Sequence, residues 1–166
     1  TGMLKGMMRP IRLLKSLNTY LLRQAISEAD QVVAFSHFSR DLIMKGINNT
    51  CANKIKVISP GVESSWFEVE RKPSSGSTLL FWGRIEEEKG LRELFHALKT
   101  VSKMITDVSL TIVGEGNRLR EYKSLVADLF LTGRVEFTGW LCSTKIQNLT
   151  ARRGLGLFPS RVESFG

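Results

Sequence analysis

The chain alternates between two hydrophobic patterns. Short, mostly apolar runs of the kind that form buried strands cover residues 32–35, 55–58, 78–82, 108–113, 134–137 and 154–158. Between them, helical spacing of apolar positions predicts helices over residues 39–45, 90–102, 118–130 and 144–152, with Ser39 as the cap of the first. This alternation predicts an α/β fold, a Rossmann-like parallel sheet with helices on both faces. Right-handed crossovers would place the carboxyl ends of the strands along one edge.

A polar segment rich in serine, proline and glycine, residues 71–77, interrupts this pattern. Such a composition is typical of a linker, so we expect residues 1–70 and 78–166 to belong to different domains. With 166 residues and 42% hydrophobic content, the chain can bury one ordinary core and part of a second.

The first 25 residues are basic. They carry Lys5, Arg9, Arg12, Lys15 and Arg23 and no acidic side chain, and much of the net charge of +8 comes from them. Apolar residues at helical spacing lie between these cations over residues 4–23. One interpretation is a helix in peripheral contact with an anionic membrane surface. The alternative is a helix whose apolar stripe packs on its own domain. Nucleic-acid binding is not expected, because stacking aromatic residues are not interleaved with the cations.

Cysteine and histidine usage indicates neither a disulfide framework nor a metal site. Cys51 and Cys142 lie far apart without metal-type spacing, which favours reduced thiols in a cytoplasmic protein, free or peripheral on the cytoplasmic face of a membrane. His37 and His96 complete no metal-binding set. No apolar run approaches the length of about 18 residues that a membrane-spanning helix needs. We expect no cofactor and no metal.

The loop from Gly83 to Gly90 is the first candidate for chemistry. It leaves a predicted strand with a glycine and places two cations, Arg84 and Lys89, where a diphosphate can be bound. The alternative is that both cations pair with the acidic residues between them, Glu86, Glu87 and Glu88, at a helix amino terminus.

Three more loops follow predicted strands. The turn at Gly114 lacks the third glycine of a dinucleotide-binding fingerprint, since Leu119 stands there, and is interpreted as an ordinary strand-to-helix turn near the ligand edge. Gly139, followed by Trp140 and Leu141, can lie against a flat nucleobase or form a simple turn. Glu163 can accept hydrogen bonds from ligand hydroxyls or cap a helix. Together the loops offer cations, glycines and a carboxylate, a set suited to a nucleotide diphosphate sugar.

These motifs, in this order, resemble those of retaining, nucleotide-sugar-dependent glycosyltransferases with the GT-B fold. The resemblance begins at about residue 28 and rests on residues 29–36, 54–62, 83–90, 112–116, 135–139 and 159–166, with Phe67 in the usual trailing position. It implies a partial GT-B fold. Residues 1–70 would be the end of the acceptor-side domain, residues 71–77 a linker, and residues 78–166 a truncated donor-binding domain.

The resemblance also implies roles. Arg84 and Lys89 would hold the donor diphosphate and stabilise the departing nucleotide, and Glu163 would be the first of a glutamate pair and engage the donor sugar. The second glutamate would fall after Gly166. The donor-binding residues expected are Gly83, Arg84, Lys89, Gly114, Gly139, Trp140, Leu141, Glu163, Ser164, Phe165 and Gly166, with Arg84, Lys89 and Glu163 catalytic.

The expected activity is transfer of a hexosyl group, with retention of configuration and without metal, from a UDP-, GDP- or ADP-sugar. The acceptor would be a glycan, a lipid-linked molecule or a small molecule. Because most of the acceptor-side domain would be missing, we expect the chain alone to be inactive. The alternatives are another GT-B enzyme acting on sugar nucleotides or sugar phosphates, such as a phosphorylase or 2-epimerase, and a non-enzymatic protein that binds anionic surfaces.

Overall fold

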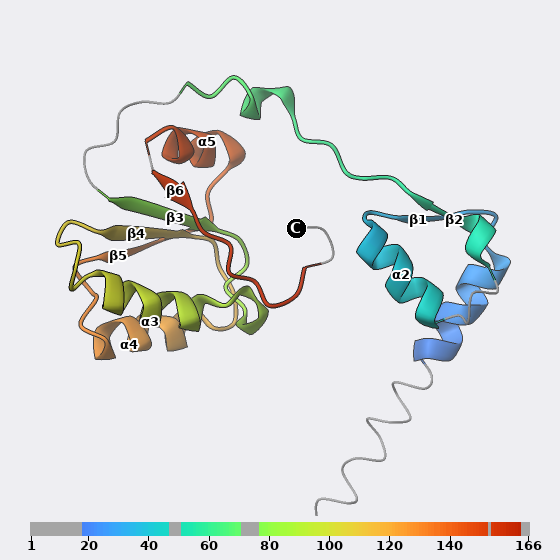
Figure 1. The fold of residues 1–166 in the computed structure, drawn as a ribbon, viewed down its shortest axis with the longest axis horizontal. Coiled ribbons are helices and arrows are strands. Elements are labelled where there is room, and N and C mark those ends of the chain that lie inside the picture. Colours follow the sequence, from blue (N-terminus) through green and yellow to red (C-terminus); the bar gives the residue numbers. More distant parts are fainter. Residues whose placement is uncertain (1–17, 47–50, 71–76, 153, 164–166) are drawn as a thin grey trace, which may run out of the picture. The chain divides into compact units, whose positions relative to one another are not determined.

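A computed structural model describes residues 18–46, 51–70, 77–152 and 154–163. The chain divides into two compact units. One contains the described residues up to Gly61, and the other runs from Val62 to Glu163. Figure 1 labels the elements of each unit.

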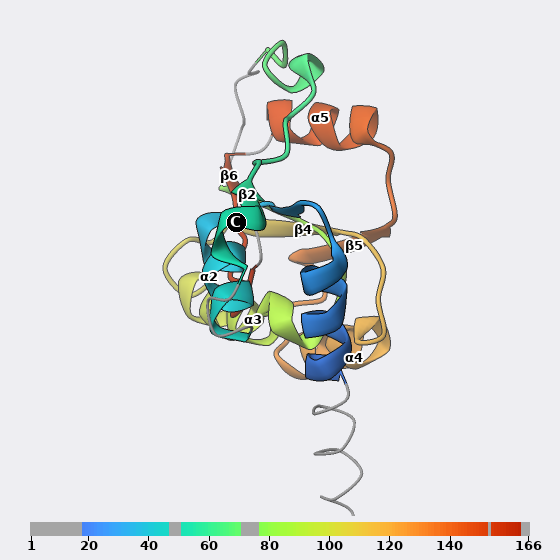
Figure 2. The ribbon, with the colours of Figure 1, turned by 90° about the vertical axis from the view of Figure 1, so that its right-hand side faces the viewer.

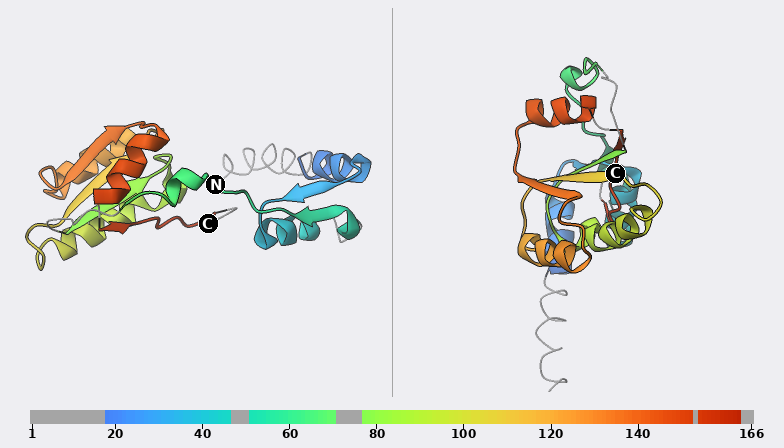
Figure 3. Two further views of the ribbon diagram at one scale, coloured as in Figure 1. Left: turned by 90° about the horizontal axis from the view of Figure 1, so that it is seen from above. Right: turned by 90° about the vertical axis from the view of Figure 1, so that its left-hand side faces the viewer.

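The first unit is built on two short parallel strands, β1 (Val32–Ala34) and β2 (Ile55–Val57). A helix over residues 18–28 and helix α2 (His37–Gly46) pack against them, and the left-hand view of Figure 3 shows both helices from above. A short 3-10 helix, η1 (Ala52–Lys54), leads into β2. The buried core of this unit is small and consists of Ile26, Ala34 and Ile55.

Helix α2 begins two residues earlier than its predicted cap. The backbone N–H of Ser39 donates to Oγ of Ser36 at 3.1 Å, and the N–H of Arg40 donates to the carbonyl of Ser36 at 3.0 Å. Ser36 therefore caps the helix, and the prediction that Ser39 does so is wrong. Ser39 stands next to the apolar positions of the predicted helix, whereas His37 and Phe38 also adopt helical geometry and place the cap at Ser36.

The second unit is a parallel sheet with helices on both faces. Its strands are β3 (Thr78–Trp82), β4 (Ser109–Val113), β5 (Val135–Gly139) and β6 (Leu155–Gly156), in the spatial order β5-β4-β3-β6. Helices α3 (Leu91–Val101) and α4 (Leu119–Asp128) cover one face and α5 (Ser143–Arg152) covers the other (Figure 2, and Figure 3, right). The α/β fold predicted from the sequence is confirmed.

The main core lies between the sheet and the α3–α4 layer. Helix α3 contributes its predicted apolar face, with Leu91, Leu94, Phe95 and Leu98 all buried. The Phe95 ring meets the Tyr122 ring of α4 edge to face, with the centroids 5.8 Å apart, and the Phe137 ring of β5 at 6.1 Å. Strand, helix and helix therefore meet at one aromatic contact, which holds the layers in register.

Residues after Gly61 pack within the second unit, although the sequence grouped residues 62–70 with the first domain. The short 3-10 helix η2 (Ser64–Trp66) lies against this unit. There Nε2 of Gln147 donates to Oγ of Ser65 at 2.9 Å, and the Trp66 ring stacks on Trp82 with a centroid distance of 6.2 Å. A composition rich in serine, proline and glycine indicates a linker, but it does not show with which domain the residues just before the linker pack.

The basic segment predicted over residues 4–23 lies mostly outside the described residues. Residues 18–23 belong to the helix over residues 18–28, where Nε of Arg23 donates to the carbonyl of Gly46 at 2.8 Å. Within the described ranges, none of the helices has both the length and the apolar character needed to cross a bilayer.

Candidate active site

The carboxyl ends of three strands align at one edge of the second unit. Trp82 of β3 is the register partner of Val113 of β4, which in turn is opposite Gly139 of β5. The N–H of Gly83 donates to the carbonyl of Val113 at 3.0 Å, and the N–H of Gly114 donates to the carbonyl of Gly139 at 2.8 Å. The structure thus brings the three predicted glycine loops side by side.

Two glycines allow the backbone of these loops to pack closely. At Gly114 φ is +134°, and a Cβ there would lie 2.0 Å from the carbonyl oxygen of Gly83. At Gly90 φ is +68°, and a Cβ would lie 2.1 Å from the carbonyl oxygen of Pro159. Neither position has room for a side chain, and both favour glycine conformationally. The first contact joins the loops after β3 and β4, and the second joins the start of α3 to the segment after β6.

Arg84 is available for a ligand. Its side chain is 75% exposed, and among the described residues its ion-pair partner is Glu88, with 3.5 Å between Nη2 and Oε1. Such a long, exposed pair contributes little to stability. The guanidinium can therefore turn to bind an anion at little cost.

Lys89 is held by Glu163 instead of by its acidic neighbours. Nζ of Lys89 lies 2.6 Å from Oε1 of Glu163, and the lysine side chain is only 17% exposed. Lys89 ends the short 3-10 helix η3 (Glu87–Lys89) and Glu163 lies on the segment after β6, so two predicted site residues meet across 74 positions of sequence. The hydrogen bond from Lys89 lowers the pKa of Glu163 below the ordinary value of 4.5, and a second hydrogen bond, with Ser160, lowers it to a smaller extent.

The stabilisation from this pair should be lost in acid. Glu163 has a lower pKa in the folded chain than in the unfolded one, so its contribution is present above pH 4.5 and disappears as the pH falls through the lowered value. The difference in thermal unfolding midpoint between wild type and Glu163→Gln should stay constant from about pH 7 to about pH 5 and shrink below that. A difference that grows on acidification would contradict this assignment.

The other acidic residues of the Gly83–Gly90 loop point to a different set of partners. Glu87 pairs with Arg118 at 2.5 Å, Arg118 also binds Glu121 at 2.6 Å, and Oε1 of Glu86 accepts the N–H of Asn117 at 3.4 Å. These contacts fasten the loop to the start of α4. The alternative in which the loop's cations pair with its own acids therefore holds weakly for Arg84 and not for Lys89.

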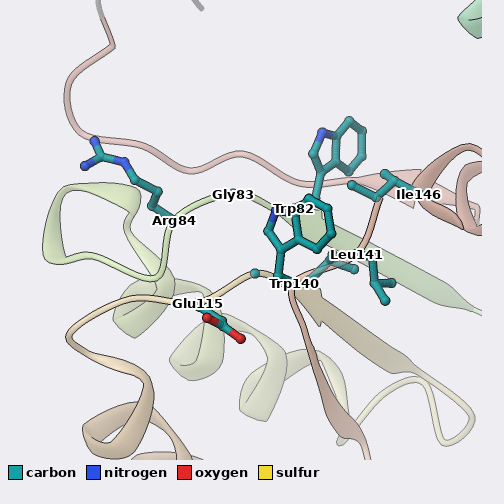
Figure 4. A pocket seen from close by; sticks show the side chains of 9 residues that line it. Trp82, Gly83, Arg84, Glu115, Trp140, Leu141 and Ile146 are labelled. Atoms are coloured by element: carbon teal, nitrogen blue, oxygen red, sulfur yellow. The ribbon is translucent and has the colours of Figure 1, made fainter. Parts of the chain in front are cut away.

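An apolar pocket of about 300 Å³ opens beside Arg84 (Figure 4). In this view the Trp82 and Trp140 rings lie between Arg84, whose side chain extends away to the left, and Leu141 and Ile146 on the right. Trp140 is 71% exposed and therefore offers a ring face to a ligand. The full lining is Trp82, Gly83, Arg84, Val113, Gly114, Glu115, Trp140, Leu141 and Ile146.

Sequence reasoning missed Trp82, Val113, Glu115 and Ile146 as pocket residues. In the sequence Trp82 is the last apolar residue of a predicted strand. In the structure Trp66 stacks on its ring, and the Phe158 ring meets it edge to face with the centroids 4.4 Å apart. Its place directly before Gly83 was the one available signal. Ile146 reaches the pocket from α5, which no loop pattern indicates.

The predicted residues Ser164, Phe165 and Gly166 lie outside the described part of the chain. The remaining predicted residues, from Gly83 to Glu163, all lie in the second unit. Among the described residues, no group of three or more His, Cys, Asp or Glu side chains converges as metal ligands would.

Comparison with known families supports this geometry. The family described as Glycosyl transferases group 1 matches residues 62–166, more than half of the chain. The chain belongs to the glycosyl transferases group 1 family. The matched region covers the second unit described above, so the family relationship that the motifs suggested is confirmed.

Relatives of this chain are considerably longer than it is. The glycosyltransferase YqgM of Bacillus subtilis is 31% identical over 146 residues, which are 87% of this chain and 39% of that protein. A glycogen synthase of Mycobacterium tuberculosis is 29% identical over 150 residues, 85% of this chain and 34% of that protein. The chain thus spans little more than a third of their length.

Solved structures share the fold. Anabaena HepE, in complex with UDP and glucose, superposes with a TM-score of 0.74 at 23% identity, over 89% of this chain and 44% of that one. S. aureus TarM, in a complex that includes UDP, gives a TM-score of 0.73 at 20% identity, over 90% of this chain and 29% of that one. Both support the α/β fold of GT-B glycosyltransferases for this glycosyl transferases group 1 chain.

Proposed function

We propose that this chain carries the donor-binding part of a glycosyltransferase that uses a nucleotide diphosphate sugar. The observation that carries the proposal is the line of groups along one sheet edge: an apolar pocket with Trp140, then Arg84, then the pair of Lys89 and Glu163. A base, a diphosphate and a sugar follow one another in the same order in the donor. HepE, a structural neighbour, is described with UDP and glucose bound.

Each group has a chemical task in this proposal. The base lies in the apolar pocket against Trp140, and Arg84 and Lys89 bind the diphosphate oxygens. As the bond from the sugar to the diphosphate breaks, negative charge grows on the leaving oxygen, and the two cations stabilise it. Glu163 accepts hydrogen bonds from sugar hydroxyls. These charges supply the electrophilic assistance, so the reaction is proposed to need neither a metal nor a cofactor.

We expect a hexosyl group from a UDP-, GDP- or ADP-sugar to be transferred with retention, which the anomeric configuration of the product, read by NMR, would test. Residues 78–163 would serve the donor. Since the chain spans only 39% of YqgM, residues 1–166 should bind donor without transferring sugar; turnover by this chain alone would refute that expectation.

Binding measurements on Arg84 test the core of the proposal. Calorimetry with UDP, GDP and ADP and their glucose conjugates should find one nucleotide that binds, and Arg84→Ala should weaken it about tenfold, since hydrogen bonds to charged groups are strong but this side chain is exposed. Arg120→Ala is the matched control, because Arg120 is an exposed arginine on α4 outside the pocket. Equal losses in both variants would mean that the diphosphate lies elsewhere.

A further inference from the structure

The two cations assigned to the diphosphate are in different states. Arg84 is 75% exposed and has a long contact with Glu88, whereas Lys89 is 17% exposed and already bound to Glu163 at 2.6 Å. A diphosphate can bind Arg84 almost without loss. At Lys89, whose ammonium has three N–H donors, it must share the cation with a carboxylate that is itself 36% exposed, or displace it.

The segments that carry this pair cannot easily move apart. The N–H of Arg161 donates to the carbonyl of Glu88 at 2.8 Å, and the Arg161 side chain forms an ion pair with Glu93 at the start of α3. The backbone of Gly90 lies so close to Pro159 that no Cβ fits between them. Opening the Lys89–Glu163 pair therefore requires rotation of the side chains and leaves both backbones in place.

An exchange at fixed backbone has an electrostatic consequence. When a free nucleoside diphosphate binds Lys89, the contact between Lys89 and Glu163 is weakened, and the Glu163 carboxylate remains beside an added negative charge. This repulsion reduces the binding free energy of the nucleoside diphosphate. When the intact donor takes Lys89, the sugar hydroxyls can donate to Glu163 and replace the hydrogen bond it lost. The same pair thus treats the two ligands differently.

We propose that the Lys89–Glu163 ion pair makes this site prefer the intact sugar nucleotide over the free nucleoside diphosphate. The pair determines specificity because only the intact donor offers a new partner to both side chains. Its phosphate binds Lys89, and its sugar hydroxyls bind Glu163. After transfer the sugar is gone, Glu163 binds Lys89 again, and release of the nucleoside diphosphate is favoured. This inference rests on the proposed function.

Calorimetry on Glu163→Gln tests the inference. The variant keeps the side-chain shape and removes the charge. It should bind the nucleoside diphosphate about fivefold tighter, the change expected from relieving a partly exposed carboxylate of unfavourable charge. It should bind the matching sugar nucleotide more weakly than wild type does. The ratio of the two affinities should therefore fall or invert, which a merely structural role of Glu163 would not produce.

Asp128→Asn is the matched control. It also removes one negative charge, but at the carboxyl end of α4, whose amino end is the one beside the aligned loops. It should leave both affinities unchanged. If Glu163→Gln does not bind the nucleoside diphosphate more tightly, or if Asp128→Asn does so equally, the inference is wrong while the proposed function stands. If wild type binds no nucleotide or sugar nucleotide at all, both are wrong.

Discussion

Replacing Gly114 with alanine should lower the free energy of unfolding by roughly 2–6 kcal/mol, the sum of about 1–3 kcal/mol of backbone strain and about 1–3 kcal/mol of steric overlap. Gly114 has φ +134°, and the new Cβ would lie 2.0 Å from a backbone oxygen of Gly83. A backbone atom cannot rotate away as a flexible side chain can. The strands behind both glycines would have to shift, and with them the loop that presents Arg84.

Gly133→Ala is the control for this prediction. Nothing lies within 4 Å of the position where its Cβ would be, and its φ is outside the range that disfavours a side chain. The change should therefore remain within about 0.5 kcal/mol of wild type. Urea unfolding of both variants decides the matter. Similar, small effects would show that the loops after β3 and β4 are not in the close contact described.

Phe95→Ala should lower the free energy of unfolding by about 3–5 kcal/mol, the range for a buried phenylalanine. The ring is fully buried and contacts Tyr122 and Phe137, so its removal leaves a cavity between the sheet and two helices. The layers cannot close around such a cavity without losing the register of α3 on the sheet. Donor affinity should fall with stability only under conditions where the variant is partly unfolded.

Phe130→Ala provides the comparison. Phe130 is 86% exposed, and Nζ of Lys99 lies over its ring, 5.2 Å from the ring centroid. An exposed contact of this kind is worth about 0.5–1 kcal/mol, so the loss should not exceed about 1 kcal/mol. Chemical unfolding of the two variants should separate them clearly. Comparable losses would place the core elsewhere than between the sheet and the α3–α4 layer.

Local pattern was sufficient for the strands and for most of the helices. Apolar runs and helical spacing located β3 without error, and the other strands and helices α2 to α5 to within a few residues, because burial on one face imposes the period directly. The same alternation implied a parallel sheet, whose strand ends must share an edge. That is why the sequence alone groups Gly83, Gly114 and Gly139 at one edge.

Contacts between distant segments were beyond such reasoning. The sequence offered Lys89 three acidic neighbours, yet its partner is Glu163, because β6 pairs beside β3 and carries its following segment onto the start of α3. Trp82 lines the pocket because Trp66 and Phe158, which are distant in sequence, pack against its ring. The periodicity of apolar residues and the composition indicate whether each position is buried, but not which other residue it contacts. The choice of partner depends on strand order and register, which arise only when the whole sheet has assembled.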